Sequence, residues 1–461
     1  MQNSNVKTNL RMVYSLHMHE VFHVVHDLDS SLGASLSFSP ILTITDPATL
    51  REKDIDVIIY NALFAPSPDV GFHAQSLIYQ LSELLSIRPS SMHSIYHAFA
   101  TNELKGFCTP ALNIRTLTYD SARLIFRLMI DKRIGAVIFE ISRNEMVYTD
   151  QNPRHYAVSV LAAAIKEGYQ GPVFLQGDHF QFNKDAFIKN RETEIDSIKV
   201  LLADTIAAQF YNIDIDASTL VDLSQPTIRQ QQQLNAEMSA LLSSHIRSTQ
   251  PDDQIISIGA EIGHIGDKNS SPEDLIAFMD MYQKLFTGTG ISKVSVQTGS
   301  KHGGTLLPDG SLQEVTLDFS VLSTIGDVAK NTYRFGGVVQ HGASTLPDTA
   351  FDNFVASNTL EVHLATQLQN IVYDNLPGSI AKKLSNWTLE QKPSEVTGDT
   401  NEQFIYKNRK RALGPFKKLL WDMRPAEKEK ITKKLEEHLH IIFEKLRIFE
   451  TKETILPYLK K

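Results

Sequence analysis

Short apolar or β-branched runs alternate with longer stretches of helical periodicity over much of the chain. Each run is followed by polar residues and then by a segment whose apolar positions recur with the spacing of one helix face. The apolar runs occupy residues 109–114, 135–142, 171–178, 210–218, 254–263, 292–299, 335–342 and 359–366. Eight strands, each followed by a helix, predict an α/β fold of the (β/α)8 barrel type.

An open, doubly wound sheet would also alternate strands and helices. Such a sheet does not need eight strands, and it usually has a glycine-rich phosphate-binding turn after an early strand. No G-x-G-x-x-G or Walker-type loop follows any of the predicted strands. The pattern therefore favours the closed barrel.

The segments on either side of the predicted barrel have different patterns. Residues 1–105 mix apolar runs, proline-containing turns and a helical stretch, and we expect an N-terminal α/β extension there. The barrel is expected over residues 106–385. Residues 386–461 begin with a polar stretch and continue with amphipathic helical segments, so we expect a C-terminal helical region.

Composition and charge narrow the class of protein. The hydrophobic fraction of 42% is ordinary for a soluble protein, and a net charge of −8 argues against a nucleic-acid or anionic-membrane partner. No apolar run is long enough for a membrane span, and the first residues lack the features of a signal peptide. The single cysteine, Cys108, fits a reducing compartment and excludes cysteine-based zinc sites. We therefore expect a cytoplasmic protein.

Histidines and carboxylates gather at the predicted strand ends. His179, His302 and His341 follow the third, sixth and seventh strands, and the ends of parallel barrel strands meet at one mouth. One histidine at such a place is more often a packed or capping residue, but three together are hard to explain in that way. Three imidazoles with an open fourth position are suited to a catalytic zinc ion.

Several short motifs support a family resemblance. The segments GDHF, AEIGHIG, SKHGG, QHGAST and EVHLATQ occur in this order and resemble the motif series of class II, zinc-dependent fructose-bisphosphate aldolases. The resemblance covers about residues 107–385. Within the family, the chain is similar to a longer subgroup whose members have an extra N-terminal region. The resemblance implies that His179, His302 and His341 bind zinc. It also implies that Asp178 is the acid/base that acts on the aldehyde oxygen.

The resemblance assigns further residues. Asp216 and Glu261 match the carboxylates of a second, exchangeable divalent-metal position. Asn113 and Ser142, on the first two strands, match substrate-contacting positions. The family also has a cradle that binds phosphate and a monovalent cation, and the matching positions are Gly303, Gly342, Ser344 and Thr366.

The sequence departs from the family pattern near its last barrel strand. His363 stands where the family usually has an asparagine, and we include it among the substrate contacts. Ala365 replaces an aspartate of many fructose-type members, as in tagatose-type members. Asp267 is a candidate base for the C3 proton. Arg409 and Arg411 are candidate contacts for the distal phosphate, although a solvated basic face explains them more simply.

The implied reaction is reversible cleavage of fructose 1,6-bisphosphate to dihydroxyacetone phosphate and glyceraldehyde 3-phosphate through a zinc-stabilised enediolate. Cleavage of a carbon–carbon bond without a Schiff base needs an electron sink, which a divalent metal supplies as a Lewis acid. The predicted strand ends offer no lysine that is suited to form a Schiff base, although Lys301 lies beside His302. We expect a phosphorylated sugar as the substrate and a homo-oligomer as the assembly.

Three alternatives stay open. The first is a tagatose-bisphosphate or other ketose-phosphate aldolase, and the second is a non-catalytic barrel subunit that stabilises such an enzyme. The third is a metallohydrolase of the amidohydrolase type built around His17 and His19, which follow an apolar run. A His-rich surface or interface explains these two residues more simply.

Overall fold

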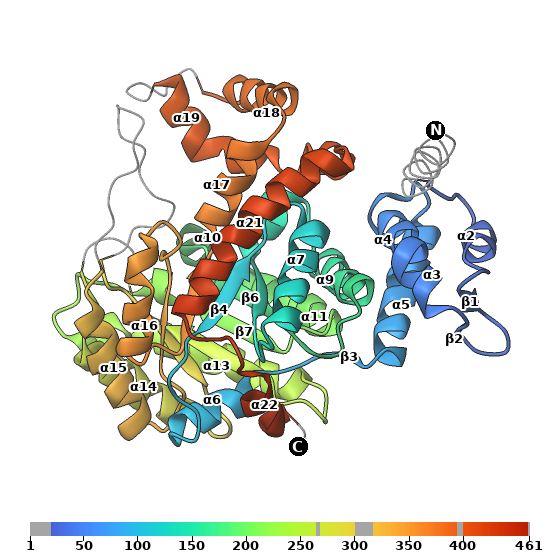
Figure 1. Cartoon of the computed structure of the whole chain (residues 1–461). Helices are drawn as coiled ribbons and strands as arrows, with labels where there is room; N and C mark the ends of the chain where they lie inside the picture. Colours follow the sequence, from blue (N-terminus) through green and yellow to red (C-terminus); the bar gives the residue numbers. More distant parts are fainter. Residues whose placement is uncertain (1–19, 264–267, 300–316, 394–399, 460–461) are drawn as a thin grey trace.

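The protein is built around a closed barrel of eight parallel strands. The computed structural model describes residues 20–263, 268–299, 317–393 and 400–459 (Figure 1). Its barrel strands are β4 Thr109–Asn113, β5 Ile138–Ser142, β6 Gly171–Gln181, β7 Asn212–Asp216, β8 Ser257–Glu261, β9 Lys293–Val296, β10 Val338–Gln340 and β11 Glu361–Leu364. Neighbours follow chain order, and the pairing of β11 with β4 closes the ring. The predicted (β/α)8 barrel is confirmed, with one strand in each predicted apolar run.

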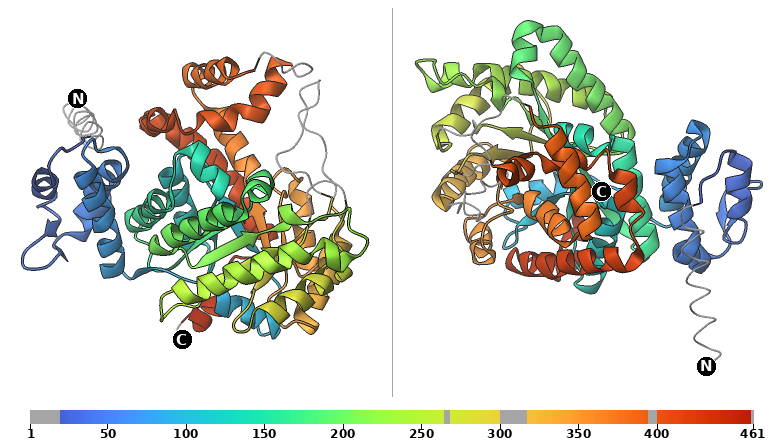
Figure 2. Two further views of the ribbon diagram at one scale, coloured as in Figure 1. Left: turned by 180° about the vertical axis from the view of Figure 1, so that it is seen from behind. Right: turned by 90° about the horizontal axis from the view of Figure 1, so that it is seen from above.

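Helices surround the barrel on its outer side (Figures 1 and 2). Those that follow the eight strands are α7 Thr118–Asp131, α8 Arg143–Thr149, α9 Pro153–Glu167, α10 Lys184–Lys189, α11 Arg191–Ala207, α12 Ile228–Gln231, α13 Gln233–Thr249, α14 Pro272–Leu285, α15 Phe319–Asn331, α16 Asp352–Ala356 and α17 Thr366–Asn375. Local signals fix their ends. Before α9, for example, the Asn152 side chain accepts from His155 N and Pro153 occupies the first turn, while Gly168 ends the helix with a φ of 68°.

The strand residues alternate between an apolar outer layer and a polar interior. On β7, Ile213 and Ile215 are buried, whereas the intervening Asp214 reaches inward to Lys293 of β9. This period of two is what a strand imposes on its side chains. The apolar core therefore lies between the barrel and its helices, and the barrel axis is lined with polar groups.

The amino end of the barrel is covered by helix α6 (His93–Ala100), which follows the short strand β3 (Ile87–Pro89). The backbone N–H of Met92 donates to Asn212 Oδ1 at 2.7 Å, and His93 Nδ1 lies 3.2 Å from Ser292 Oγ. Both partners stand at the starts of barrel strands. Helix α6 therefore closes the end of the barrel opposite to the carboxyl ends of the strands.

The residues before β3 form a lobe beside the barrel (Figure 2). Its elements are α2 Val25–Ser31, β1 Leu36–Ser37, β2 Thr43–Ile44, α3 Pro47–Thr49, η1 Leu50–Asp54, α4 Ile55–Phe64 and α5 Pro68–Leu84. Buried Asp56 anchors the lobe, because its carboxylate accepts from Tyr119 at 2.6 Å and pairs with Lys166 at 2.5 Å. Both partners lie on barrel helices.

The C-terminal region is helical over its described residues and runs back across the barrel. It comprises α18 Gly378–Glu390, α19 Asn401–Asn408, η4 Arg409–Ala412, α20 Lys417–Trp421, α21 Pro425–Lys445, α22 Lys452–Ile455 and η5 Leu456–Leu459. The long helix α21 lies against α7, where Lys428 pairs with Asp120 at 3.2 Å. Domain limits at residues 105 and 385 stay a prediction. Within the described ranges, no helix has the length and apolar character of a membrane span.

Helix α6 makes folding stability depend on pH. Burial lowers the pKa of His93 to about 4, and Arg247 adds to this effect. As the pH falls below about 6.5, the unfolded chain binds a proton at this imidazole, whereas the native protein does so only near pH 4. The free energy of unfolding therefore falls over this interval. Between pH 6.5 and 4.5 the free energy of unfolding should fall less in the variant His93→Gln than in the wild type. We expect the two decreases to differ by about 2 kcal/mol.

Urea denaturation at the two pH values measures this difference. The variant His26→Gln is the control, because it removes an exposed imidazole from the N-terminal lobe. Equal losses of stability in the wild type and in the His93 variant would show that this histidine carries no burial cost.

Candidate active site

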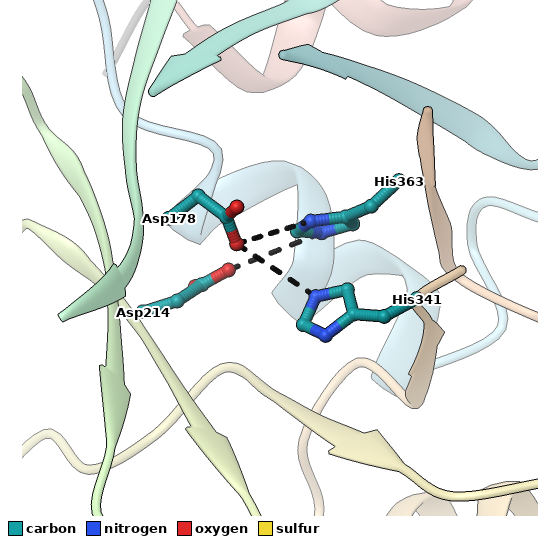
Figure 3. Close-up of side chains that lie close together, drawn as sticks. All are labelled: Asp178, Asp214, His341 and His363. Atoms are coloured by element: carbon teal, nitrogen blue, oxygen red, sulfur yellow. Dashed lines mark ion pairs between the residues drawn. The ribbon is translucent and has the colours of Figure 1, made fainter. Parts of the chain in front are cut away.

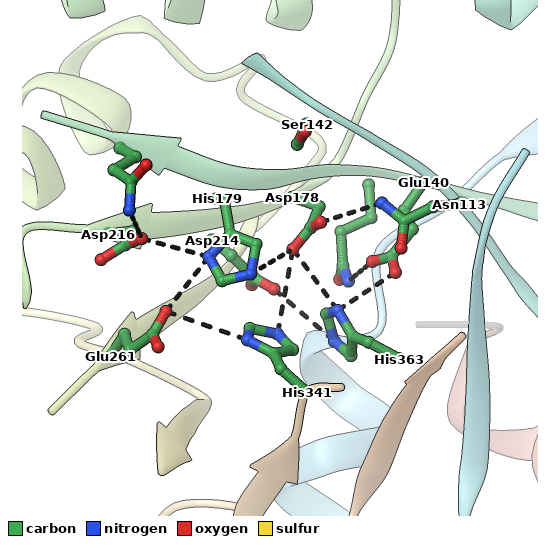
Figure 4. A network of polar contacts seen from close by, with 12 residues as sticks. Asn113, Glu140, Ser142, Asp178, His179, Asp214, Asp216, Glu261, His341 and His363 are labelled. Carbon is green, nitrogen blue, oxygen red and sulfur yellow. Dashed lines mark hydrogen bonds and ion pairs between the residues drawn. The ribbon is translucent and has the colours of Figure 1, made fainter. Parts of the chain in front are cut away.

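A cavity of about 390 Å³ opens at the carboxyl ends of the barrel strands. Histidine and carboxylate side chains from β6, β8, β10 and β11 meet at its base (Figures 3 and 4). The predicted site residues that line it are Asn113, Ser142, Asp178, His179, His341, Gly342, Ser344, His363 and Thr366. Asp216 and Glu261 lie just behind, where both contact His179.

Some predicted residues cannot be placed. His302 and Gly303, expected in the zinc site and the phosphate cradle, lie outside the described residues. The same holds for Asp267, His17 and His19.

An irregularity in β6 directs two neighbouring side chains into the site. The pairing of β6 with β7 shifts register between Gly177 and Phe180, and His179 has a φ of 44°. Side chains at successive positions of a regular strand point to opposite faces, so the bulge is what allows Asp178 and His179 to converge. Gly177 is needed there, because a Cβ atom at this position would lie 2.5 Å from the Phe180 ring.

His179, His341 and Glu261 form a compact group. His179 Nδ1 lies 3.1 Å from Glu261 Oε2, and the same carboxylate oxygen lies 3.9 Å from His341 Nδ1. The two imidazole rings are 4.1 Å apart between centroids. Each residue offers one ligand atom within 4.8 Å of the others, and Glu261 Oε2 is buried without a hydrogen bond. Two imidazoles and one carboxylate fit a divalent transition metal.

Asp216 contacts the same nitrogen of His179, Nδ1, that faces Glu261. Its Oδ2 lies 3.1 Å from His179 Nδ1 and accepts from Gln181 at 3.0 Å, while its Oδ1 accepts from Ser218 Oγ at 2.7 Å. A carboxylate behind a histidine fixes the orientation of the ring. Burial raises the pKa of Glu261 to about 7, with Asp216 adding to it, because two carboxylates share this corner.

Asp178 lies at the centre of the histidine groups. Its Oδ2 accepts from Asn113 at 2.9 Å, and its Oδ1 faces His363 Nδ1 at 3.4 Å and both His179 Nε2 and His341 Nε2 at 3.8 Å (Figures 3 and 4). Burial alone would raise the pKa of Asp178, but the imidazoles of His179 and His363 outweigh it and keep the pKa well below its ordinary value. The carboxylate is therefore ionised.

His363 is held between carboxylates at the base of the cavity. Its Nε2 lies 2.5 Å from Glu361 Oε1, and its Nδ1 lies 3.1 Å from Glu140 Oε1. The ring is 4.1 Å from that of His341. An asparagine could not span this set of partners, so the departure from the family pattern alters the base of the site.

A second polar layer below the site was not predicted from the sequence. Its members are Glu140, Gln176, Asp214, Lys293 and Glu361, all at most 5% exposed. A signal was nevertheless present, because four of them stand two positions before a predicted site residue, as Glu361 does before His363. With a side-chain period of two, such residues must face the same interior.

Lys293 is the cation of this layer. Its Nζ lies 2.5 Å from Glu361, 3.0 Å from Asp214 and 2.8 Å from the Gln176 side-chain oxygen. Burial would lower its pKa, but the two carboxylates outweigh burial and raise it. A protonated amine held in this way is not a nucleophile, so Lys293 is unsuited to Schiff-base chemistry.

Backbone groups at one side of the cavity suit an anion. Gly342 has a φ of 71°, a conformation that favours glycine, and Ser344 Oγ accepts from Gln367 N at 3.4 Å. Helix α17 begins at Thr366, so the N–H groups of its first turn lie at the cavity wall. Ser142 contributes its hydroxyl as the cap of α8, where it accepts from Glu145 N at 3.2 Å.

The outer wall of the cavity comes from beyond the barrel. Tyr406 and Lys407 of α19 and Lys410 of η4 line it together with Arg115, which follows β4. Arg409, a candidate phosphate contact, is not part of this lining. Its guanidinium lies over the rings of Tyr373 and Tyr406 at 4.6 and 4.7 Å. Arg411 lines a separate cavity beside Trp387 and Phe404.

Fold and site together define a (β/α)8-barrel protein with a buried histidine–carboxylate centre at the carboxyl ends of its strands. The chain belongs to the class-II fructose-bisphosphate aldolase family, whose model matches residues 94–442. Members of this family act on phosphorylated sugars and generally depend on a metal ion. A search among curated proteins found no match.

Some of the similar solved structures share the fold at low sequence identity, with TM-scores just above 0.5. A probable tagatose 6 phosphate kinase from Sinorhizobium meliloti 1021 has a TM-score of 0.52 and 14% identity, over 76% of this chain and 93% of that one. The fructuronate-tagaturonate epimerase UxaE from Cohnella laeviribosi has a TM-score of 0.51 and 11% identity, over 84% and 86%. The fructose-bisphosphate aldolase of Campylobacter jejuni has a TM-score of 0.45 and 16% identity, over 79% and 96%.

The compact group predicts how zinc binds. We expect His341→Ala and Glu261→Gln each to weaken zinc binding at least tenfold, since each removes one of the atoms that converge there. Titration calorimetry on chelator-treated protein measures the affinity, and His438→Ala on α21 is the control for a histidine outside the cavity. Unchanged zinc affinity in both site variants would exclude this grouping as the metal site.

Proposed function

We propose that the protein is a class II, metal-dependent aldolase and thus a carbon–carbon lyase that reversibly cleaves fructose 1,6-bisphosphate. The products are dihydroxyacetone phosphate and glyceraldehyde 3-phosphate. The observation that carries this proposal is the position of the ionised Asp178 carboxylate, which faces His179 and His341 in one cavity. A metal ion bound there would polarise the substrate carbonyl and stabilise the enediolate.

The described residues supply one of the two proton transfers, the one at the C4 hydroxyl; C3 of the enediolate must gain a second proton, for which Asp267 outside the described residues is the candidate donor. As the bond between C3 and C4 breaks, the C4 hydroxyl must lose its proton to become an aldehyde. Asp178 is suited to accept it, because Asn113 holds Oδ2 and leaves Oδ1 directed towards the histidines. In the reverse direction the same oxygen returns the proton. This carboxyl lines the cavity although it is only 3% exposed.

The charges along the cavity support a substrate with two anionic ends. Gly342, Ser344 and the start of α17 offer N–H and hydroxyl donors to one phosphate. Lys407 and Lys410 stand on the outer wall, where the other end of an extended sugar would lie. Burial and the neighbouring Arg115 lower the pKa of Lys410, as expected where cations crowd together.

A tagatose-bisphosphate or other ketose-phosphate aldolase is the second candidate. It is favoured by Ala365, which lines the cavity where many fructose-type members carry an aspartate. The stereochemistry at C4 distinguishes the two sugars, so both must be assayed.

The decisive assay measures cleavage of both ketose bisphosphates before and after removal of metal by EDTA, and again after zinc is added back. We expect activity to disappear with the metal and to return with zinc. Asp178→Asn should reduce kcat by a factor of about 10² to 10⁴ while zinc stays bound, because the proton acceptor is lost.

The matched control is Asp56→Asn, which removes a buried carboxylate of the N-terminal lobe. Activity that survives complete metal removal would contradict the mechanism. A zinc-loaded protein that cleaves neither sugar would support the alternative of a non-catalytic barrel subunit.

The outer wall generates a separate prediction. We expect Lys407→Gln and Lys410→Gln each to raise KM for the bisphosphate about fivefold, which corresponds to about 1 kcal/mol for a solvent-exposed ion pair. KM for a ketose 1-phosphate, which lacks the second anion, should change little. Lys382→Gln on α18 is the control from the same region. An equal rise of KM for both sugars would place the second phosphate elsewhere.

A further inference from the structure

A column of polar contacts runs along the barrel axis from helix α6 to the base of the active site. The hydroxyl of Tyr96, on α6, donates to Glu361 Oε2. The other oxygen of this carboxylate, Oε1, lies 2.5 Å from Lys293 Nζ and 2.5 Å from His363 Nε2. On its far side, His363 Nδ1 lies 3.4 Å from Asp178 Oδ1. Three contacts thus connect the amino end of the barrel with the proposed proton acceptor, and Lys293 binds the carboxylate in the middle of this path.

Glu361 is the acceptor in each of its own contacts. It is fully buried, and Tyr96, Lys293 and the Gln176 amide all donate to it. Its partner atom in His363, Nε2, must therefore carry a proton. The Nε2–H edge of the imidazole therefore points towards Glu361 and the amino end of the barrel, and Nδ1 points towards Asp178.

We infer that Tyr96 is a positioning residue of the active site, which acts through Glu361 to hold the His363 ring against Asp178. Its hydroxyl binds the oxygen of Glu361 that does not contact His363. Without this hydroxyl, Oε2 loses its donor in a fully buried place, and only the contacts of Oε1 with Lys293, Gln176 and His363 oppose rotation of the carboxylate. Turning moves Oε1 away from His363 Nε2, and the ring then loses its lower support.

Tyr96 itself is remote from the substrate. It does not line the cavity, and it belongs to the segment that precedes the first barrel strand. Any effect on turnover must therefore pass through Glu361 and His363. The inference gives part of the N-terminal region a role beyond covering the barrel. Its kinetic consequence rests on the proposed function, whereas its geometric consequence does not.

The test compares Tyr96→Phe with Tyr282→Phe in the full-length, zinc-loaded protein. Tyr282 is a matched control, because its buried hydroxyl donates to Ser243 Oγ at 2.9 Å on the outer helices. Both variants lose one buried hydrogen bond, and Tyr96→Phe should lose more stability than Tyr282→Phe because its acceptor is a carboxylate. We expect kcat to fall about tenfold in Tyr96→Phe alone, with KM changed less than twofold and zinc content unchanged.

A double variant shows whether the effect passes through His363. If Tyr96 acts through this ring, adding Tyr96→Phe to His363→Asn should lower kcat no further than His363→Asn alone. Losses that multiply would contradict the inference. So would equal kcat values for the two tyrosine variants.

A spectroscopic measurement separates this inference from the proposed function. In protein labelled with ¹⁵N-histidine, the imidazole signal that is missing from His363→Asn identifies His363. We expect that signal to shift in Tyr96→Phe and to stay in place in Tyr282→Phe. An unshifted signal in Tyr96→Phe would overturn the inference whatever the activity. A shifted signal in a protein without aldolase activity would instead refute the proposed function and leave the positioning intact.

Discussion

Buried negative charge inside the barrel is the constraint on which the rest of the structure depends. The carboxylates along the axis and at its mouth are Glu140, Asp178, Asp214, Asp216, Glu261 and Glu361, each at most 6% exposed. Removing an ion from water costs several kcal/mol unless a partner compensates. Lys293 and the imidazoles of His179 and His363 compensate part of this charge. Burial, opposed in part by His363, still raises the pKa of Glu140 to about 8, as excess negative charge requires.

Because of this constraint, we expect metal binding and folding to be coupled in such a site. A divalent cation next to Glu261 would neutralise charge that the protein's own groups leave uncompensated. It also explains the layered arrangement, in which four of the strand-end residues, Ser142, Asp178, Asp216 and His363, have a polar neighbour two positions earlier. The deeper layer holds the upper one in place, as the contacts of Glu361 with His363 illustrate.

Much of the fold followed from the sequence, because eight apolar runs and their helices repeat one local pattern. The strand ends carrying Asp178, His179, His341 and His363 were also predictable, since parallel strands must bring their ends together. Contacts between residues far apart in the sequence could not be predicted. Nothing local indicates that Tyr96 reaches Glu361 across 265 positions or that Lys410 stands at the mouth of the cavity. Such contacts arise from packing of separate segments, for which one sequence holds no periodic signal.

The outer wall of the cavity has a consequence for the order in which the protein is made. The base of the cavity depends on α6, which precedes the first barrel strand. The rim of the cavity depends on α19 and η4, which follow the last barrel strand. A ribosome that has released residues up to the end of β11 has exposed every strand of the barrel but not Lys407 or Lys410. The base of the site can therefore form during synthesis, before its rim exists. A substrate held at both ends is accommodated only by a nearly finished chain.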